Sequence, residues 1–217
     1  MRQLISLLGI TFLLVILVLG CGKPEEPAQT PKPAAKPQTA PAKPAATKHA
    51  QEGTAKLLLY DDPDMPIRTE YPDIMKVEAT GSGEGVGFIF AFKPQGNALD
   101  KAKVHIFLPR GAGTAAAQEP FVTGPQGLIT NNGWKKEGDT TNIAEFPYGW
   151  VKKIIGFSDP ANKGMVGKIL LGEAGGQALQ VILYYQSDMA KEYRANADII
   201  LGRLHFKSDK LPLGKPH

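Results

Sequence analysis

A single cysteine at the end of an apolar run constrains this chain more than any other feature. Cys21 is the only cysteine among the 217 residues, so a folded part has no internal disulfide and depends on its hydrophobic core. The apolar run before it covers the 16 residues from Leu4 to Leu19, and Arg2 is the only charge before Lys23. A charged start, an apolar stretch and a small residue before the cut are typical of a secretory signal. The run is short of the ~20 residues that an uncleaved anchor helix needs.

The residues around this cysteine resemble the processing motif of bacterial lipoproteins. That motif has small or aliphatic residues ending in Gly or Ala and then Cys. Val18, Gly20 and Cys21 match it, whereas Leu19 is bulkier than the usual residue. The resemblance implies a diacylglyceryl group on the Cys21 sulfur, cleavage before that residue and acylation (palmitate) of the new N-terminus. Two or more acyl chains hold a protein stably on a membrane, so we expect lipid anchoring through Cys21.

The composition changes sharply after the anchor and again near residue 53. From Lys23 to about Glu52 the chain consists mostly of Pro, Ala, Lys, Gln and Thr. Such a segment buries too little apolar surface to offset the entropy of ordering, and its prolines favour extended conformations. We therefore predict three parts: a signal peptide at residues 1–20, the lipidated cysteine with a disordered linker at residues 21–52, and a globular domain at residues 53–217.

Location and partners are predicted from the anchor and from the charge. The resemblance to lipoproteins implies the cell envelope. Gly22, in place of the Asp that often signals inner-membrane retention, favours an outer membrane facing the periplasm if the source is Gram-negative. Residues 53–217 hold 19 Lys and Arg against 18 Asp and Glu, so the net charge of +4 is not concentrated in a patch. We expect a membrane through the lipid, and an envelope protein or the cell wall, as partners, and no nucleic acid.

Strand patterns dominate the predicted domain. The residues from Val104 to Leu108 alternate apolar positions with His105 and Phe107, which indicates a half-buried strand. Similar runs are expected as strands at residues 56–60, 67–71, 74–79, 86–92, 134–137, 150–157, 165–171 and 178–185. Successive strands with few helices between them predict the α+β class, with a single antiparallel-sheet domain and helices packed on it.

Two helical segments interrupt the strands. Thr114 is a suitable cap for the alanine run that follows it. Pro120, Gly124, Pro125 and Gly127 are expected to limit that helix to one or two turns, followed by a loop and a weak second turn. The second helix is expected to begin at Ser187 or Asp188 and to continue to about Leu204. Its apolar stripe is formed by Met189, Tyr193, Ala197, Ile200 and Leu204.

The end of the chain resembles the close of PsbP/DcrB-like domains. In that family a final amphipathic helix with an Ala-x-x-Ile-Leu-type stripe leads into a short Leu-x-Phe strand, as in AKEYRANADIILGRLHFK at residues 190–207. The turn at Tyr71-Pro72-Asp73 and the Gly133-Trp134 step also fit. The resemblance covers residues 55–208, with a long interruption at residues 120–147. It implies a PsbP-like sandwich, no shared catalytic residues, and binding or assembly roles, often on membrane-tethered exported proteins.

No catalytic residue, metal ligand or cofactor is predicted. The sequence has neither a Gly-x-Ser-x-Gly elbow nor a His-Glu-x-x-His helix motif. Asp61, Asp62 and Asp64 lack the spacing of a calcium loop, and with Pro63 they are expected to form a turn. His105 has no nearby Ser, Cys or Asp in sequence and is expected to be structural or at the surface.

The aromatic residues Trp134, Tyr148 and Trp150 form the candidate ligand surface. Such residues either stack on a sugar or anchor a loop, and the sequence leaves both open. The favoured function is a membrane-anchored, non-enzymatic binding or assembly module. One alternative is a small-ligand carrier, with a pocket near Trp134 and Trp150. The other is an envelope hydrolase, with Glu145 paired to Asp159 or Glu173 across a cleft.

Overall fold

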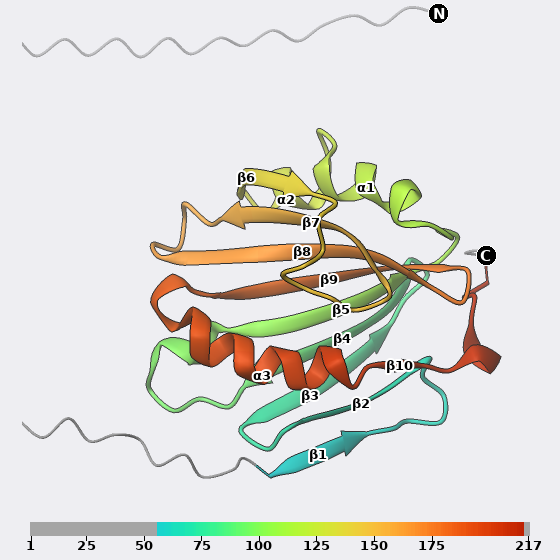
Figure 1. The fold of residues 1–217 in the computed structure, drawn as a ribbon, viewed down its shortest axis with the longest axis horizontal. Coiled ribbons are helices and arrows are strands. Elements are labelled where there is room, and N and C mark those ends of the chain that lie inside the picture. The colour runs from blue at the N-terminus through green and yellow to red at the C-terminus, as the bar shows by residue number, and fades with distance from the viewer. Residues whose placement is uncertain (1–55, 215–217) are drawn as a thin grey trace, which may run out of the picture. The chain divides into compact units, whose positions relative to one another are not determined.

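The computed structural model describes residues 56–214 (Figure 1). The predicted signal peptide and linker, with Cys21, lie outside the described residues. The strands are β1 (Leu57–Tyr60), β2 (Ile67–Pro72), β3 (Met75–Gly81), β4 (Gly85–Phe92), β5 (Lys103–Pro109), β6 (Lys135–Thr140), β7 (Val151–Ser158), β8 (Met165–Ala174), β9 (Gln177–Gln186) and β10 (His205–Phe206). The helices are α1 (Ala115–Thr123), α2 (Leu128–Asn131) and α3 (Ala190–Gly202), with short 3-10 turns at Ala98–Lys101, Ser187–Met189 and Ser208–Lys210.

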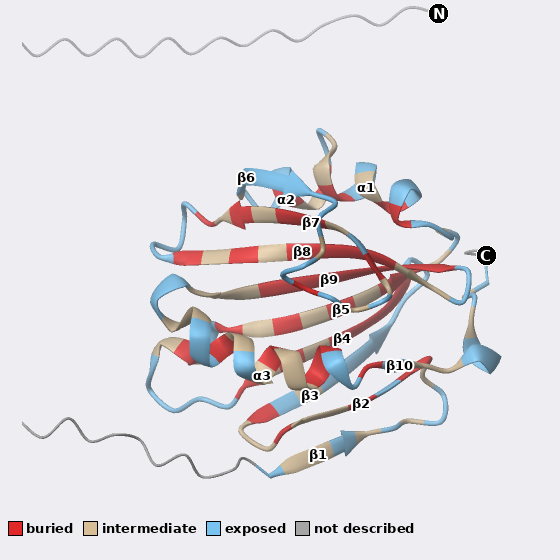
Figure 2. Cartoon of the chain, in the orientation of Figure 1, coloured by how far each residue is buried: buried red, intermediate tan, exposed pale blue. Residues whose placement is uncertain are grey.

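Two antiparallel sheets carry the described part of the chain. The larger has seven strands in the order β3-β4-β5-β9-β8-β7-β6, and the smaller has three in the order β1-β2-β10. In the larger sheet β5 pairs with β9, so the early strands β3 to β5 and the late strands β6 to β9 join at the centre. Figure 2 shows most of β8 and β9 and half of β7 buried, whereas β6 at the edge is exposed along its length.

Alternation along the strands separates the two faces of the larger sheet. Side chains of successive strand residues point to opposite faces. On β5, Val104, Ile106 and Leu108 are fully buried in a large apolar cluster that also contains residues of α3. The residues between them, His105 and Phe107, are only partly buried and point to the opposite face.

The first face is covered by α3, which lies across the sheet in Figure 1. Its buried residues Tyr193, Ala197, Ile200 and Leu201 recur at helical spacing and pack in the same cluster as Phe88 and Phe90 of β4. The small sheet closes this side: the Thr69 hydroxyl of β2 donates to the Ile200 carbonyl of α3 at 2.7 Å.

The second face is covered by α1 and α2 over the late strands β6 to β9. Ala115 and Val122 of α1 and Ile129 of α2 pack in a smaller cluster with Ile155, Phe157, Ile169, Leu171 and Ile182 of these strands. The two helices have nine and four residues, which is too short to extend across β5 and β4 as well. The second face therefore stays open over the early strands.

The predicted α+β class, with helices packed on an antiparallel sheet, is confirmed. Thr114 caps α1 as expected, accepting from the Ala117 N–H at 3.1 Å. Pro120 does not end the helix as expected, because it lies inside α1, which continues to Thr123 before Gly124. Proline removes only one intrahelical N–H, and the Gly124 N–H still donates to the Pro120 carbonyl at 2.9 Å. The expected loop and short second turn follow, the latter as α2. Within residues 56–214, no helix combines the length and the apolar character that crossing a membrane would require.

Candidate functional site

A groove with a cavity volume of about 940 Å³ lies on the open part of the second face. Its floor is formed by β5 and β9, and its wall by α1 and α2. A strand rises about 3.4 Å per residue, so the floor from Lys103 to Arg110 is on the order of 24 Å long. The volume is within the range of small-ligand sites, and the length suits a chain-like ligand.

Aromatic rings lying over glycines form part of the floor. A Cβ atom on Gly87 would stand 3.3 Å from the Nε2 atom of His105, and one on Gly85 would stand 2.7 Å from the Cζ atom of Phe107. The two rings therefore lie against the backbone of β4, with their centroids 6.4 Å apart. Because His105 and Phe107 both line the groove, flat ring surfaces remain available to a ligand.

Two glutamines connect the wall to the floor. Gln118 of α1 and Gln180 of β9 are 4% and 6% exposed, although both line the groove. The Gln118 Nε2 atom donates to the Gln180 Oε1 atom at 3.2 Å. Buried polar groups are costly unless they are hydrogen-bonded, so this pair fixes the two carboxamides relative to each other.

Two further aromatic residues lie on the side of the helices. Phe121 of α1 lines the groove with 69% of its surface exposed, although aromatic side chains usually bury most of their surface. Trp134 follows α2 and stacks on Phe157 of β7, with ring centroids 4.1 Å apart and planes 14° apart. This stack holds the indole of Trp134 in place where it lines the groove.

The charges lie towards the two ends of the groove. Lys103 is at one end, over the ring of Tyr184 at 5.7 Å, and Arg110 and Glu84 are at the other. Burial, and secondarily the positive charge of Lys103, hold the pKa of His105 below its usual range. At neutral pH His105 is therefore uncharged, and the middle of the groove is lined by neutral side chains.

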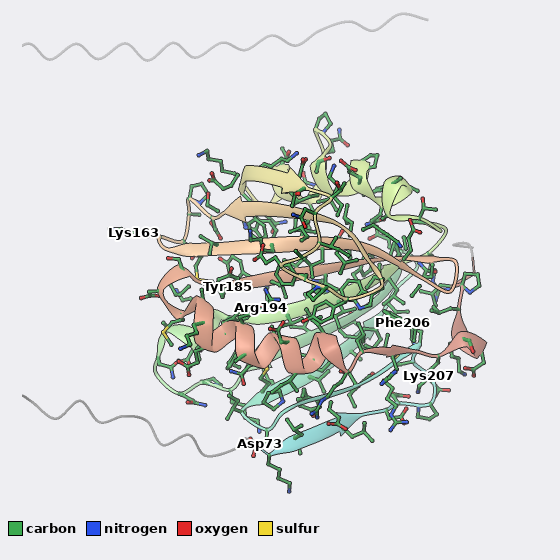
Figure 3. The ribbon with its side chains drawn as sticks, viewed as in Figure 1. Asp73, Lys163, Tyr185, Arg194, Phe206 and Lys207 are labelled. Carbon is green, nitrogen blue, oxygen red and sulfur yellow. The ribbon has the colours of Figure 1, made fainter. Side chains whose placement is uncertain are left out.

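A smaller hollow of about 280 Å³ lies on the opposite face, beside the beginning of α3. Tyr185 and Arg194, labelled in Figure 3, both line it. Tyr185 stacks on Tyr193 with centroids 4.4 Å apart, and the guanidinium of Arg194 lies 3.8 Å from the centroid of Phe146. These aromatic and cationic groups already have partners within the protein, so the hollow is less suited to a ligand than the groove.

The structure separates the three aromatic residues of the predicted ligand surface. Trp134 packs with the cluster on the second face. Tyr148 and Trp150 stack on each other at 5.7 Å and pack with the cluster on the first face. The Tyr148 hydroxyl donates to Asp198 of α3, and burial together with this hydrogen bond raises the pKa of Tyr148. Trp134 alone of the three lines the groove.

The carboxylates considered for hydrolysis are each held in a different place. Glu145 is 3.5 Å from Lys168 and 3.9 Å from Arg194. Asp159 accepts the Tyr184 hydroxyl at 2.6 Å before β8 begins, and Glu173 accepts the Ala115 N–H at 2.9 Å near the end of β8. Glu173 lies eight residues, or on the order of 27 Å, along β8 from its first residue Met165, so Asp159 and Glu173 lie near opposite ends of this strand.

No group of three or more His, Cys, Asp or Glu side chains within the described residues is placed to hold a metal ion. The Asp61 carboxylate is 2.8 Å from Lys207, labelled in Figure 3 after β10. The hydrogen bond with Lys207 is the main cause that lowers the pKa of Asp61. Asp61 thus connects the loop after β1 to the segment directly after β10.

Sequence reasoning missed most residues of the groove. Gln180 interrupts an otherwise apolar run in β9, and a lone polar residue in a buried strand is a signal for an internal hydrogen bond or a site. The sequence predicts His105 only as structural or at the surface, since residues distant in sequence supply its surroundings. Gln118 and Phe121 carry no local signal, because only the packing of α1 decides which of its residues reach the groove.

The fold is similar to solved structures that share little sequence with this chain. Cyanobacterial PsbP (CyanoP) from Synechocystis sp. PCC 6803 is 13% identical with a TM-score of 0.47, over 72% of this chain and 96% of that one. The Ran-binding protein Mog1p of Saccharomyces cerevisiae is 10% identical with a TM-score of 0.46, over 73% and 99%. A mutant of protein Mog1 is 11% identical with a TM-score of 0.46, over 72% and 98%. No protein-family model and no curated protein sequence matches the chain.

Proposed function

We propose that residues 56–214 form a non-enzymatic binding module and that the groove on the second face is its binding surface. The observation that carries the proposal is the groove itself, which is about 940 Å³ in volume and lined by aromatic and carboxamide side chains. A concave, partly apolar surface with a few fixed polar groups is the usual form of a binding site. The exposed Phe121 at its wall adds an apolar contact that the protein does not bury itself.

We further propose that this module is attached to a membrane of the cell envelope through a lipid on Cys21. Support comes from the sequence: the apolar run, the residues before Cys21 and the Pro-rich segment after it. The segment from Lys23 to Glu52 then acts as a spacer that carries the module away from the membrane surface. Labelled fatty acid should be incorporated into the chain in producing cells. Incorporation that persists in a Cys21→Ala variant would contradict the attachment.

Crosslinking in living cells tests the binding surface. Phe121 and Leu59 are the two large apolar residues that stay exposed within residues 56–214, at 69% and 55%. A photoreactive phenylalanine analogue at position 121 should give a discrete crosslinked product. The same analogue at position 59, on β1 and outside the groove, is the matched control and should give none. Equal products at both positions, or none at position 121 in a folded chain, would contradict the groove as binding surface.

A further inference from the structure

The glutamine pair in the groove has hydrogen-bonding capacity that the protein does not use. The Gln118 Oε1 and Gln180 Nε2 atoms have no hydrogen-bond partner among residues 56–214. They are also not among the polar atoms sealed from solvent without a partner, which in the described residues are the Tyr60 hydroxyl and the Gln186 Oε1 atom. Since both glutamines line the groove, their unused atoms face the space that a ligand would occupy.

The pair leaves one free acceptor and one free donor. Gln118 uses its nitrogen and Gln180 uses its oxygen in their mutual hydrogen bond, which leaves one oxygen and one nitrogen. Reversing the direction of that bond leaves one acceptor and one donor again. A secondary amide carries the complementary groups, an N–H and a C=O. Side chains that are 96% and 94% buried are also held firmly enough to select such a group.

The surfaces beside the pair are flat and uncharged. His105 and Phe107 lie against Gly87 and Gly85, so one surface of each ring faces the groove. Trp134 is held by its stack on Phe157. Flat aromatic surfaces suit the apolar C–H face of a sugar ring. An extended peptide is usually bound by pairing with a sheet edge and by pockets for alternate side chains, whereas this groove lies on the face of the sheet.

We propose that the groove binds a chain of N-acetylated amino sugars, which names the ligand class of the binding module proposed above and rests on that function. The N–H and C=O of a trans acetamido group point in opposite directions. One acetamido group therefore uses the glutamine pair either through its N–H, which donates to the free acceptor, or through its C=O, which accepts from the free donor. The sugar rings pack against the aromatic rings of the floor and wall. The long groove accommodates several successive units, because its floor follows β5 for on the order of 24 Å.

Calorimetric titration of the purified full chain tests the ligand class. The probes are the trimer of N-acetylglucosamine, the corresponding trimer of glucose, which lacks the acetamido groups, and an extended hexa-alanine peptide. The acetylated trimer should bind at least tenfold more tightly than the glucose trimer. Equal affinity for the two trimers would overturn the role of the acetamido group. If the chain binds the peptide but not the acetylated trimer, the ligand is a peptide and the proposal is wrong.

Substitutions test whether the glutamine pair recognises the acetamido group. Gln180→Met, together with Gln118→Met so that neither carboxamide is left unpaired, should remove the tenfold preference for the acetylated trimer. Gln95→Met is the matched control, because Gln95 is exposed and does not line the groove. Phe107→Leu, which keeps both glutamines, should weaken both sugar trimers alike. A preference that survives in the double variant would overturn the proposal.

Failure of this inference differs from failure of the proposed function. A chain that crosslinks through position 121 but binds none of the sugar probes keeps its binding module and loses the sugar ligand. A chain that neither crosslinks there nor binds the probes loses both.

Discussion

The two faces of the seven-stranded sheet are covered by other elements to different extents. On the first face the 13 residues of α3 and the small sheet cover the apolar side chains of β4 and β5 completely. On the second face the shorter α1 and α2 cover the late strands and leave β5 and β4 open. The extent of the covering helices, rather than the sheet itself, therefore decides where this fold has room for a ligand.

Polar groups follow the same division. Beneath α3 the Tyr193 hydroxyl donates to the Lys103 carbonyl at 2.8 Å, and Thr69 donates to Ile200, so both hydroxyls are used inside the protein. At the groove Gln118 and Gln180 satisfy each other only in part. The Tyr60 hydroxyl on the first face has no partner but is sealed from solvent. The second face alone therefore combines unused hydrogen-bonding groups and aromatic surface with a groove that a ligand can enter.

Two phenylalanines on neighbouring strands test this division with the largest expected effect. Phe88 of β4 is 0% exposed beneath α3 and lies 5.6 Å from the ring of Tyr60, whereas Phe107 of β5 lines the groove. Phe88→Ala should lower the free energy of unfolding by about 3–5 kcal/mol, because it leaves a cavity in a closed core. Phe107→Ala should cost about 1 kcal/mol or less. Urea denaturation measures both, and equal losses would show that the second face is as closed as the first.

The fold class could be predicted from the sequence because the strands carry their own signal. In β5 the alternation of Val104, Ile106 and Leu108 with polar or aromatic residues is local and indicates which residues share a face. The stripe on the last helix is local in the same way, and Tyr193, Ala197 and Ile200 are buried as expected. Nothing local shows which strands meet, so the pairing of β5 with β9 followed only from the structure.

The candidate site was much less predictable. Trp134, Tyr148 and Trp150 lie within 17 residues of one another in sequence, yet they pack on opposite faces of the sheet. The groove instead combines β5, β9 and two helices, and Gln118 and Gln180 are separated by 62 positions. A site built from distant elements depends on the sheet order and on how far α1 extends, and neither property has a pattern in the sequence.

Glycines beneath aromatic rings allow the covered and the open parts of the second face to be compared. A Cβ atom on Gly167 would overlap the Leu183 carbonyl and the Phe157 ring, which is held in place by Trp134. One on Gly87 would approach only side-chain atoms, 3.1 Å from the Thr80 Oγ1 atom and slightly farther from His105. Gly167→Ala should therefore destabilise by about 1–3 kcal/mol, as overpacking does.

Gly87→Ala, by contrast, should cost less than about 1 kcal/mol, because the neighbouring side chains can move into the open groove. Thermal unfolding of the two alanine variants gives the comparison directly. A larger loss for Gly87→Ala would mean that the floor over the early strands is as tightly packed as the covered half.

The smallest expected effect concerns pH and the ring of His105. Burial, followed by the charge of Lys103, lowers the pKa of this histidine in the folded state. The unfolded chain then binds the proton more readily, so lowering the pH through the unfolded value of about 6.5 favours unfolding. The contribution of His105 to stability is fully present above that pH. It declines as the pH falls and is lost once the pH is below the folded pKa of His105. Urea denaturation at pH 7.5 and pH 5 should show a smaller loss for His105→Gln than for the unaltered chain. Equal losses would mean that the ring is as well solvated in the folded groove as in the unfolded chain, and that the floor is more open than its contacts with β4 imply.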